Sequence, residues 1–187
     1  MRGSRLRIAI VLALVVAVLA IAPVALVVQP FVIAIASQPP RVDPARLEAH
    51  VKHLSVDLYP RSYDQRENLE QAAQYILDEF KAAGGRVAVQ DVILGDSKFK
   101  NIVAHFGPES GPLIVVGAHY DSFGDTYSGA RFPRGYTSQT HTPAADDNAS
   151  GVAGLLELAH LIGQEPSARS IDLVAYTLEE PPHFRTE

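Results

Sequence analysis

The sequence predicts an α/β fold in which a mixed, largely parallel sheet carries helices on both faces and is preceded by one transmembrane helix. Three observations lead to this prediction. No charged residue occurs from Ile8 to Ala36, and apolar residues recur at helical spacing from Arg66 to Ala83. Near the C-terminus, a strand, a helix and a second apolar strand follow one another, an order typical of a parallel crossover connection.

The uncharged N-terminal segment is long enough to span a bilayer. Ile8 to Val28 alone supplies roughly 20 apolar positions, the number that a helix needs to cross the hydrocarbon core. A cleaved signal peptide is the alternative, because Ala34-Ile35-Ala36 resembles a cleavage site, but the apolar regions of signal peptides run to only about 7 to 15 residues. We therefore expect residues 1–37 to form an arginine-rich tip and a membrane anchor that contacts the lipid bilayer.

Charge predicts the orientation of this anchor in the cell membrane. Three arginines precede the uncharged segment, and no further lysine or arginine occurs until Arg41. The positive-inside rule then places the N-terminus in the cytoplasm. We expect a single-pass protein whose residues 38–187 form one extracytoplasmic domain, since a chain of 187 residues is long enough for one domain with a core.

Composition excludes several classes of function. The net charge is −5 and the sequence shows no basic stripe, so nucleic acid is not an expected partner. The chain has no cysteine, which excludes a disulfide framework and any thiolate nucleophile or ligand.

The first elements of the domain follow from capping residues and turns. Asp43 and Pro44 suit the N-cap and first turn of a helix that runs to about Val56. Gly84-Gly85 ends the helix that begins at Arg66. Gly-containing turns then separate three predicted strands, at Arg86–Leu94, Phe99–Phe106 and Leu113–Ala118.

The second half of the domain begins with a long irregular segment from Tyr120 to Ala145, rich in Gly, Ser, Thr and Pro. A loop of this length in a compact domain is usually functional or disordered. A helix with one apolar face is predicted to begin near Asn148 and to end near Gly163. The last strand covers Ser170 to Leu178.

Three polar clusters lie within this last strand–helix–strand unit, where strands end or a helix begins. They are His119 with Asp121, Asp146 with Asp147, and Glu179 with Glu180. Open α/β sheets bind ligands at the carboxyl ends of their strands, so we expect the clusters to meet at one rim of the sheet. Imidazole and carboxylate groups are zinc ligands, and hydrolytic metal sites also need a base for the attacking water.

Each cluster by itself also has an ordinary structural explanation. A His-x-Asp pattern occurs at polar strand ends, Asp and Asn cap helices, and adjacent acids often follow an exposed strand. Capping does not explain why Asp146, Asp147 and Asn148 follow one another, because adjacent carboxylates repel unless a cation or donors compensate. The occurrence of all three clusters in one unit favours a site.

The motifs GAHYDS and ADDNASG and the pair Glu179-Glu180, in this order and spacing, resemble the co-catalytic two-zinc exopeptidases of peptidase family twenty-eight, clan MH. The resemblance covers about Leu69 to Glu187. It implies a zinc-peptidase-like α/β fold, two zinc ions in the complete enzyme, and peptide or protein N-termini as substrates.

The same resemblance implies a role for each matching residue. His119 would bind one zinc ion, Asp147 would bridge both ions, and Glu180 would bind the other. Glu179 would be the general base, with Asp121 behind the ligands and Asn148 holding the bridging carboxylate.

The resemblance therefore indicates a membrane-anchored zinc-dependent exopeptidase, with an aminopeptidase as the leading type. A glutaminyl cyclase or a carboxypeptidase of the same fold is one alternative, and a non-catalytic peptidase-like binding domain is another. In this family, a further Asp and His ligand come well after the glutamate pair. We therefore expect this chain to be an N-terminal portion of the enzyme, truncated at its C-terminus, and to be inactive or metal-poor alone.

Overall fold

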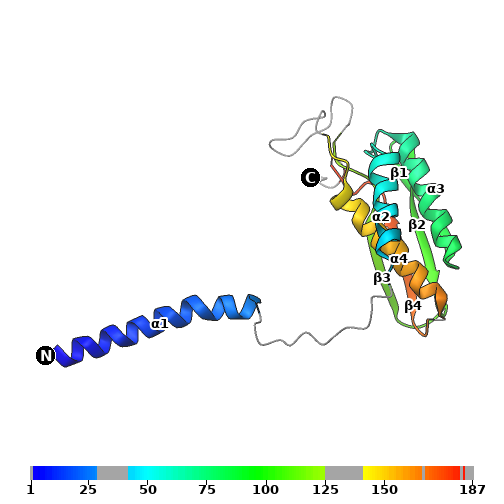
Figure 1. Cartoon of the computed structure of the whole chain (residues 1–187). Helices are drawn as coiled ribbons and strands as arrows, with labels where there is room; N and C mark the ends of the chain where they lie inside the picture. The colour runs from blue at the N-terminus through cyan, green and yellow to red at the C-terminus, as the bar shows by residue number, and fades with distance from the viewer. Residues whose placement is uncertain (1, 29–41, 125–140, 166, 182, 184–187) are drawn as a thin grey trace. The chain divides into compact units, whose positions relative to one another are not determined.

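The computed structural model describes residues 2–28, 42–124, 141–165, 167–181 and 183, and the chain divides into two compact units, Met1–Pro40 and Arg41–Glu187 (Figure 1). The helices and strands in chain order are α1 (Arg2–Val28), α2 (Pro44–Lys52), η1 (His53–Asp57), α3 (Arg66–Ala82), β1 (Arg86–Leu94), β2 (Ser97–Phe106), β3 (Leu113–His119), η2 (Ala145–Ala149), α4 (Ser150–Gln164) and β4 (Ser170–Tyr176). Of the predicted irregular segment from Tyr120 to Ala145, residues 125–140 lie outside the described residues.

The predicted transmembrane helix is not supported. In the part of the chain that the structure describes, no helix is both long enough and apolar enough to cross a bilayer. The prediction rested on the absence of charge and on a count of roughly 20 apolar positions from Ile8 to Val28. An absence of charge along a sequence is a weaker condition than sustained hydropathy within one helix of sufficient length.

The sheet of the second unit is mixed, as predicted, but it is not largely parallel. Its strand order is β1-β2-β4-β3, and only the β3–β4 pair is parallel. Strands β1 and β2 form an antiparallel hairpin because only Gly95 and Asp96 separate them, and Gly95 adopts a φ of +56° in the turn. The parallel pair arises because α4 provides a connection long enough to place β4 beside β3 in the same direction.

The prediction of helices on both faces of the sheet is wrong for the described residues. Both α3 and α4 pack against the sheet and against each other, and α2 packs on α4, so these helices lie on one face (Figure 1). Apolar periodicity identifies the side of a helix that is buried, but it does not say which face of the sheet the helix covers. The core between these helices and the sheet includes Leu54, Ile76, Phe80, Ile102, Ala104, Val152, Leu156, Ala159 and Leu173.

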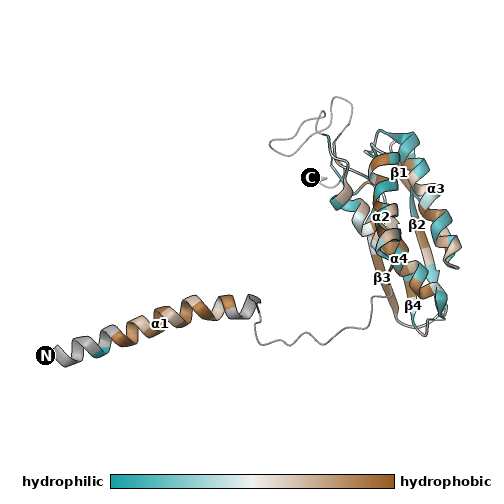
Figure 2. Ribbon diagram, in the orientation of Figure 1, coloured by the Kyte–Doolittle hydropathy of each residue, from teal (hydrophilic) through white to brown (hydrophobic). Residues whose placement is uncertain are grey.

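Strand β3 is an edge of the described sheet and exposes apolar side chains. The side chains of Leu113 and Val115 are about half exposed, at 51% and 53%. Figure 2 shows hydrophobic colouring on the visible part of this strand. The last two residues of β3, Ala118 and His119, are by contrast buried. Burial therefore increases toward the carboxyl end of the strand.

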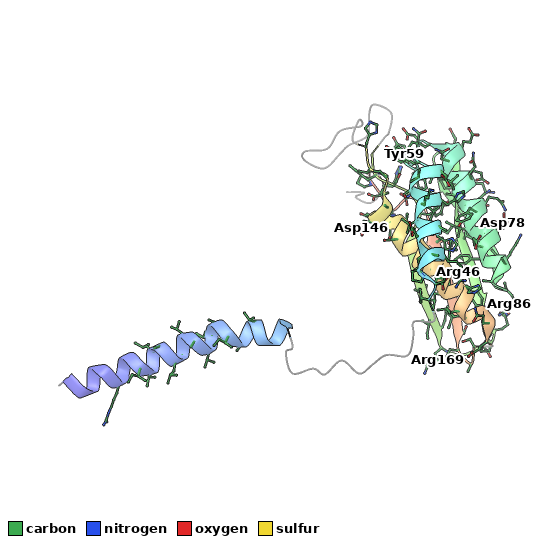
Figure 3. All side chains as sticks on the ribbon, in the orientation of Figure 1. Arg46, Tyr59, Asp78, Arg86, Asp146 and Arg169 are labelled. Carbon is green, nitrogen blue, oxygen red and sulfur yellow. The ribbon has the colours of Figure 1, made fainter. Side chains whose placement is uncertain are left out.

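An ion pair fastens α2 to α4. Arg46 donates two hydrogen bonds to the carboxylate of Glu157, from Nε to Oε2 and from an Nη to Oε1, each 2.8 Å long. The backbone N–H of Asp43 donates to the same carboxylate at 3.0 Å. Glu157 is 2% exposed, while Arg46, labelled in Figure 3, reaches it from α2. The hydrogen bonds from Arg46 outweigh the effect of burial and lower the pKa of Glu157 from 4.5 to about 2.

We expect the stability that Glu157 contributes to depend on pH. Because its folded pKa is depressed, this contribution is complete above about pH 4.5 and is lost as the pH falls toward 2. Urea unfolding of the wild type and of Glu157→Gln should differ most at neutral pH and converge over that acidic range. The control is Glu109→Gln, which removes an ion pair to Arg86 at an 80% exposed side chain and should matter little at any pH. A difference that grows on acidification would contradict the assignment.

Gly154 and Gly163, both in α4, give a second test of the helix packing. A methyl group at Gly163 would overlap the backbone carbonyl oxygen of Ala83 at the end of α3, whereas a methyl group at Gly154 would meet no atom within 4 Å. Gly163→Ala should therefore destabilise the chain by about 1–3 kcal/mol, as overpacking does. Gly154→Ala should stabilise it by about 0.5–1 kcal/mol through helix propensity. Equal effects of the two substitutions on urea unfolding would show that α3 and α4 do not meet at Gly163.

Candidate metal centre

The three predicted clusters lie at one end of the second unit. His119 is the last residue of β3, and Glu179 and Glu180 follow the end of the parallel strand β4. The ladder continues one residue past β3, since the N–H of Tyr120 donates to the carbonyl of Tyr176, the last residue of β4, at 2.9 Å. Figure 3 labels Asp146, in η2, and Tyr59, which both lie toward this end. The labelled Arg86 and Arg169 lie toward the other end.

His119 presents its two ring nitrogens to different groups. Nδ1 lies 3.3 Å from the backbone oxygen of Asp121 and 3.5 Å from its carboxylate Oδ1, whereas Nε2 lies 3.0 Å from Oδ1 of Asp147 and 3.7 Å from Oε2 of Glu179. Since Nδ1 faces only acceptors, these partners assign a proton to it, and in the neutral ring Nε2 carries the free lone pair. That lone pair points at carboxylate oxygens, so a proton or a metal cation has to lie between them.

The electrostatics of the cluster agree with this geometry. Burial disfavours the charged form of His119, but the hydrogen bond to Asp121 and the charges of Asp121, Glu179 and Asp147 prevail and raise its pKa to about 9. Burial, together with the charge of Asp147 and smaller contributions from the other acids, raises the pKa of Glu180 to about 7. Several carboxylates therefore lie close to one another here, an arrangement that a positive charge among them would stabilise.

Asp121 lies behind the cluster and joins its parts. The residue is 1% exposed. Its carboxylate accepts hydrogen bonds from the backbone N–H groups of Glu179, at 3.2 Å, and Glu180, at 3.0 Å, in addition to facing Nδ1 of His119. One buried carboxylate therefore sets the positions of both glutamates and the orientation of the imidazole.

Asp147 and Asn148 lie in η2, just before α4, and their side chains make different contacts. The backbone of both residues is non-helical, and the side chain of Asp147 is 76% exposed while it faces His119. Asn148 was expected to hold the carboxylate of Asp147. Its Oδ1 accepts a hydrogen bond from the N–H of Gly151 in the first turn of α4, at 3.0 Å. A methyl group at Gly151 would overlap this amide, so glycine permits the contact.

The donor set fits a zinc ion. His119, Glu179 and Glu180 each offer a ligand atom, and these atoms lie within 4.8 Å of one another. Imidazole nitrogen and carboxylate oxygen are zinc ligands that bind at about 2.0–2.2 Å, so donors at this spacing suit a tetrahedral ion. The structure thus brings together His119, Asp147, Glu179 and Glu180. Their division into ligands and base remains a prediction.

Sequence reasoning overlooked Arg61, which the structure places beneath this centre. Its side chain is fully buried, and its backbone N–H donates to Oγ of Ser122 at 3.0 Å. An arginine that follows a proline between two helices looks like an ordinary loop residue. No local pattern marks such a residue, because its partners lie far away in the sequence.

Comparison with known proteins agrees with the geometry. Residues 101–183, which contain all three clusters, match peptidase family M28. This match assigns that region of the chain to peptidase family M28. The chain is 46% identical over 165 residues to the uncharacterized protein YfbL of Escherichia coli (strain K12), a match that covers 88% of the chain and 49% of YfbL.

Solved structures of M28-like fold are also similar. A glutaminyl cyclase from Tannerella forsythia superposes with a TM-score of 0.62 at 28% identity, over 79% of this chain and 52% of that one. A Zn-dependent exopeptidase from Parabacteroides distasonis ATCC 8503 gives a TM-score of 0.60 at 28% identity, over 79% of this chain and 51% of that one. The chain thus spans about half the length of these proteins, and the family that its residues 101–183 match is a peptidase family.

We expect Asp121→Asn to weaken zinc binding. The amide retains one acceptor oxygen but turns an N–H group toward existing donors, so the glutamate backbone and His119 lose a common support. Substitution of such an outer partner typically lowers metal affinity about 10–100-fold. Competition with a chromogenic chelator would measure the change.

The matched control is Asp172→Asn. Oδ1 of Asp172 lies 2.6 Å from Nδ1 of His105 in a second His–Asp pair, which sits on the sheet between β2 and β4. This substitution should leave zinc affinity unchanged. Equal losses in the two variants would show that the loss does not come from the contacts of Asp121.

Proposed function

We propose that this chain carries the metal-binding part of a zinc-dependent exopeptidase of the aminopeptidase type. The observation that supports the proposal most directly is the convergence of His119, Glu179 and Glu180 within 4.8 Å, with Asp147 beside His119. The three segments that supply these residues are the carboxyl ends of two parallel strands and the start of the helix that connects them. This is the rim at which open α/β sheets bind their ligands.

In this proposal, His119, Asp147 and Glu180 hold zinc and Glu179 acts as the general base. Bound zinc would polarise the scissile carbonyl and lower the pKa of the attacking water. Glu179 suits the role of base because its side chain is 43% exposed and lies beside the ligand His119, so it can take a proton from water and deliver it to the leaving amine. A module that only binds a partner would need no such base.

The charge of the centre favours a substrate with a free amino terminus. Several carboxylates meet one imidazole here, and Asp147 and Glu179 are exposed enough to act on an approaching ligand. A single divalent ion would leave a net negative charge on this set. Such a rim attracts the ammonium group of a peptide N-terminus and repels a C-terminal carboxylate, which supports an aminopeptidase over a carboxypeptidase.

Glutaminyl cyclase activity is the second candidate. The similarity to the Tannerella forsythia glutaminyl cyclase, at a TM-score of 0.62, favours it. The charge argument also fits, because this reaction too takes place at the amino end of a peptide. Substrates decide between the two activities: an aminoacyl chromogenic amide reports an aminopeptidase, and a peptide with N-terminal glutamine reports a cyclase.

The described donors suffice for one ion. Zinc takes about three or four protein ligands, and His119, Asp147, Glu179 and Glu180 are the metal-capable side chains that the described residues bring together. We therefore expect this 187-residue chain to bind about one zinc ion and to turn over slowly. Tight binding of two ions with brisk turnover would contradict this expectation.

The roles of the two glutamates can be separated by substitution. Glu179→Gln should retain zinc but lower any zinc-dependent turnover by about 10²–10⁴-fold, the usual contribution of a general base. His119→Ala and Glu180→Gln should lose zinc and turnover together. Zinc content would be measured by chelator competition and turnover with both substrates. A wild-type chain that binds no zinc would refute the proposed function, and a Glu179→Gln variant with full turnover would refute the assignment of the base.

A further inference from the structure

Arg61 is the largest fully buried side chain among the described residues, with 0% exposure. The mechanism proposed above makes no use of it. Burying a guanidinium is costly unless its N–H groups are hydrogen-bonded and its charge is accompanied by an opposite charge. The neighbours of Arg61 therefore indicate what its burial achieves.

The guanidinium donates to three backbone carbonyls from three separate segments. Nε donates to Tyr120 at 2.9 Å, one Nη donates to Leu54 in η1, and the other lies 3.4 Å from the carbonyl of Ala144. Tyr120 directly follows His119, and Ala144 comes three residues before Asp147. One side chain thus links the two segments that supply the closest pair of groups in the metal centre.

The backbone of Arg61 reinforces the same link. Its N–H donates to Oγ of Ser122 at 3.0 Å, and its carbonyl accepts from the N–H of Ser122 at 3.1 Å. Asp121 lies between the two contacted residues, Tyr120 and Ser122. The loop that carries Asp121 is therefore held on both sides by one residue.

The positive charge of Arg61 also interacts with Asp121 of this loop. Burial lowers the pKa of Arg61 to about 10, and the charge of Asp121 opposes that decrease. The guanidinium therefore remains protonated at neutral pH. This buried positive charge compensates in part for the negative charge of Asp121.

We propose that Arg61 is a positioning residue of the metal centre, whose guanidinium fixes the distance between the segments of His119 and Asp147 and whose backbone holds the loop that carries Asp121. The inference rests on the proposed zinc site, which it deepens. Arg61 touches neither the metal donors nor a substrate. It acts through Tyr120, Asp121 and Ala144.

The test compares Arg61 with an arginine of purely structural role. Arg61→Lys keeps the charge, but a single ammonium group cannot serve three carbonyls from different segments. Arg46→Lys is the matched control, because Arg46 joins α2 to α4 through Glu157. Urea unfolding of the metal-free variants would show how far each substitution destabilises the chain.

Two measurements distinguish an effect of Arg61 on the position of His119 from a general effect on folding. The first is the side-chain ¹⁵N resonances of His119 in the metal-free chain at fixed pH, with His105 as an internal reference. They should shift in Arg61→Lys and stay unchanged in Arg46→Lys. The second is zinc affinity by chelator competition, which should fall about 10–100-fold in Arg61→Lys only, as for other groups that orient metal ligands.

The outcomes are distinct. A folded Arg61→Lys variant with unaltered His119 resonances would overturn the inference, as would an equal loss of zinc affinity in Arg46→Lys. If Arg61→Lys does not fold, Ser122→Ala replaces it, because that change removes only the Oγ contact and should shift His119 to a smaller extent; no shift would overturn the inference. A wild-type chain that binds no zinc would refute the proposed function, while the resonances of His119 would still test Arg61.

Discussion

The buried carboxylate of Asp121 is the contact on which the arrangement of the metal centre depends. It accepts the backbone N–H groups of Glu179 and Glu180 after β4 and faces the imidazole of His119 at the end of β3. A hydrogen bond to a charged group contributes about 1.5–3 kcal/mol, and an unpaired buried carboxylate would cost more than that. The carboxylate of Asp121 therefore holds the two strand ends together, and breaking its hydrogen bonds would be costly.

The centre combines this rigid support with an unfavourable concentration of negative charge. Asp147, Glu179 and Glu180 surround one imidazole. Hydrogen bonding and negative charge raise the pKa of His119, whereas burial and then the charge of Asp147 raise the pKa of Glu180. A folded chain maintains such repulsion only when other interactions compensate. The fully buried Arg61, whose charge acts on Asp121, is one compensating group, and a metal cation between the donors would be another.

The packing of the unit leaves the opposite side of the sheet uncovered in the described residues. Helices α3 and α4 cover one face, and the apolar residues Leu113 and Val115 of the edge strand β3 are about half exposed. The carboxyl end of the same strand is nevertheless buried, because the Arg61 loop and the start of α4 enclose it. His119 of the candidate centre thus lies at the buried end of a strand whose other residues are mostly exposed.

Sequence by itself determined the elements and the identity of the candidate residues. Helical spacing, caps and turns located α3, β1, β3 and α4 to within about two residues, because these signals depend on neighbours in the chain. The order strand, helix, strand predicted the parallel β3–β4 pair, and that pair is what brings His119 near Glu179 and Glu180.

Only the tertiary structure decided the layers, the supports and the actual contacts. The helices lie on one face, Oδ1 of Asn148 accepts from the N–H of Gly151, and Arg61 is fully buried. Each of these depends on groups far apart in the sequence: Arg61 contacts Tyr120 and Ala144 across 59 and 83 positions. Periodicity and capping carry no information about such distances, because the interactions form only after the sheet and helices have packed.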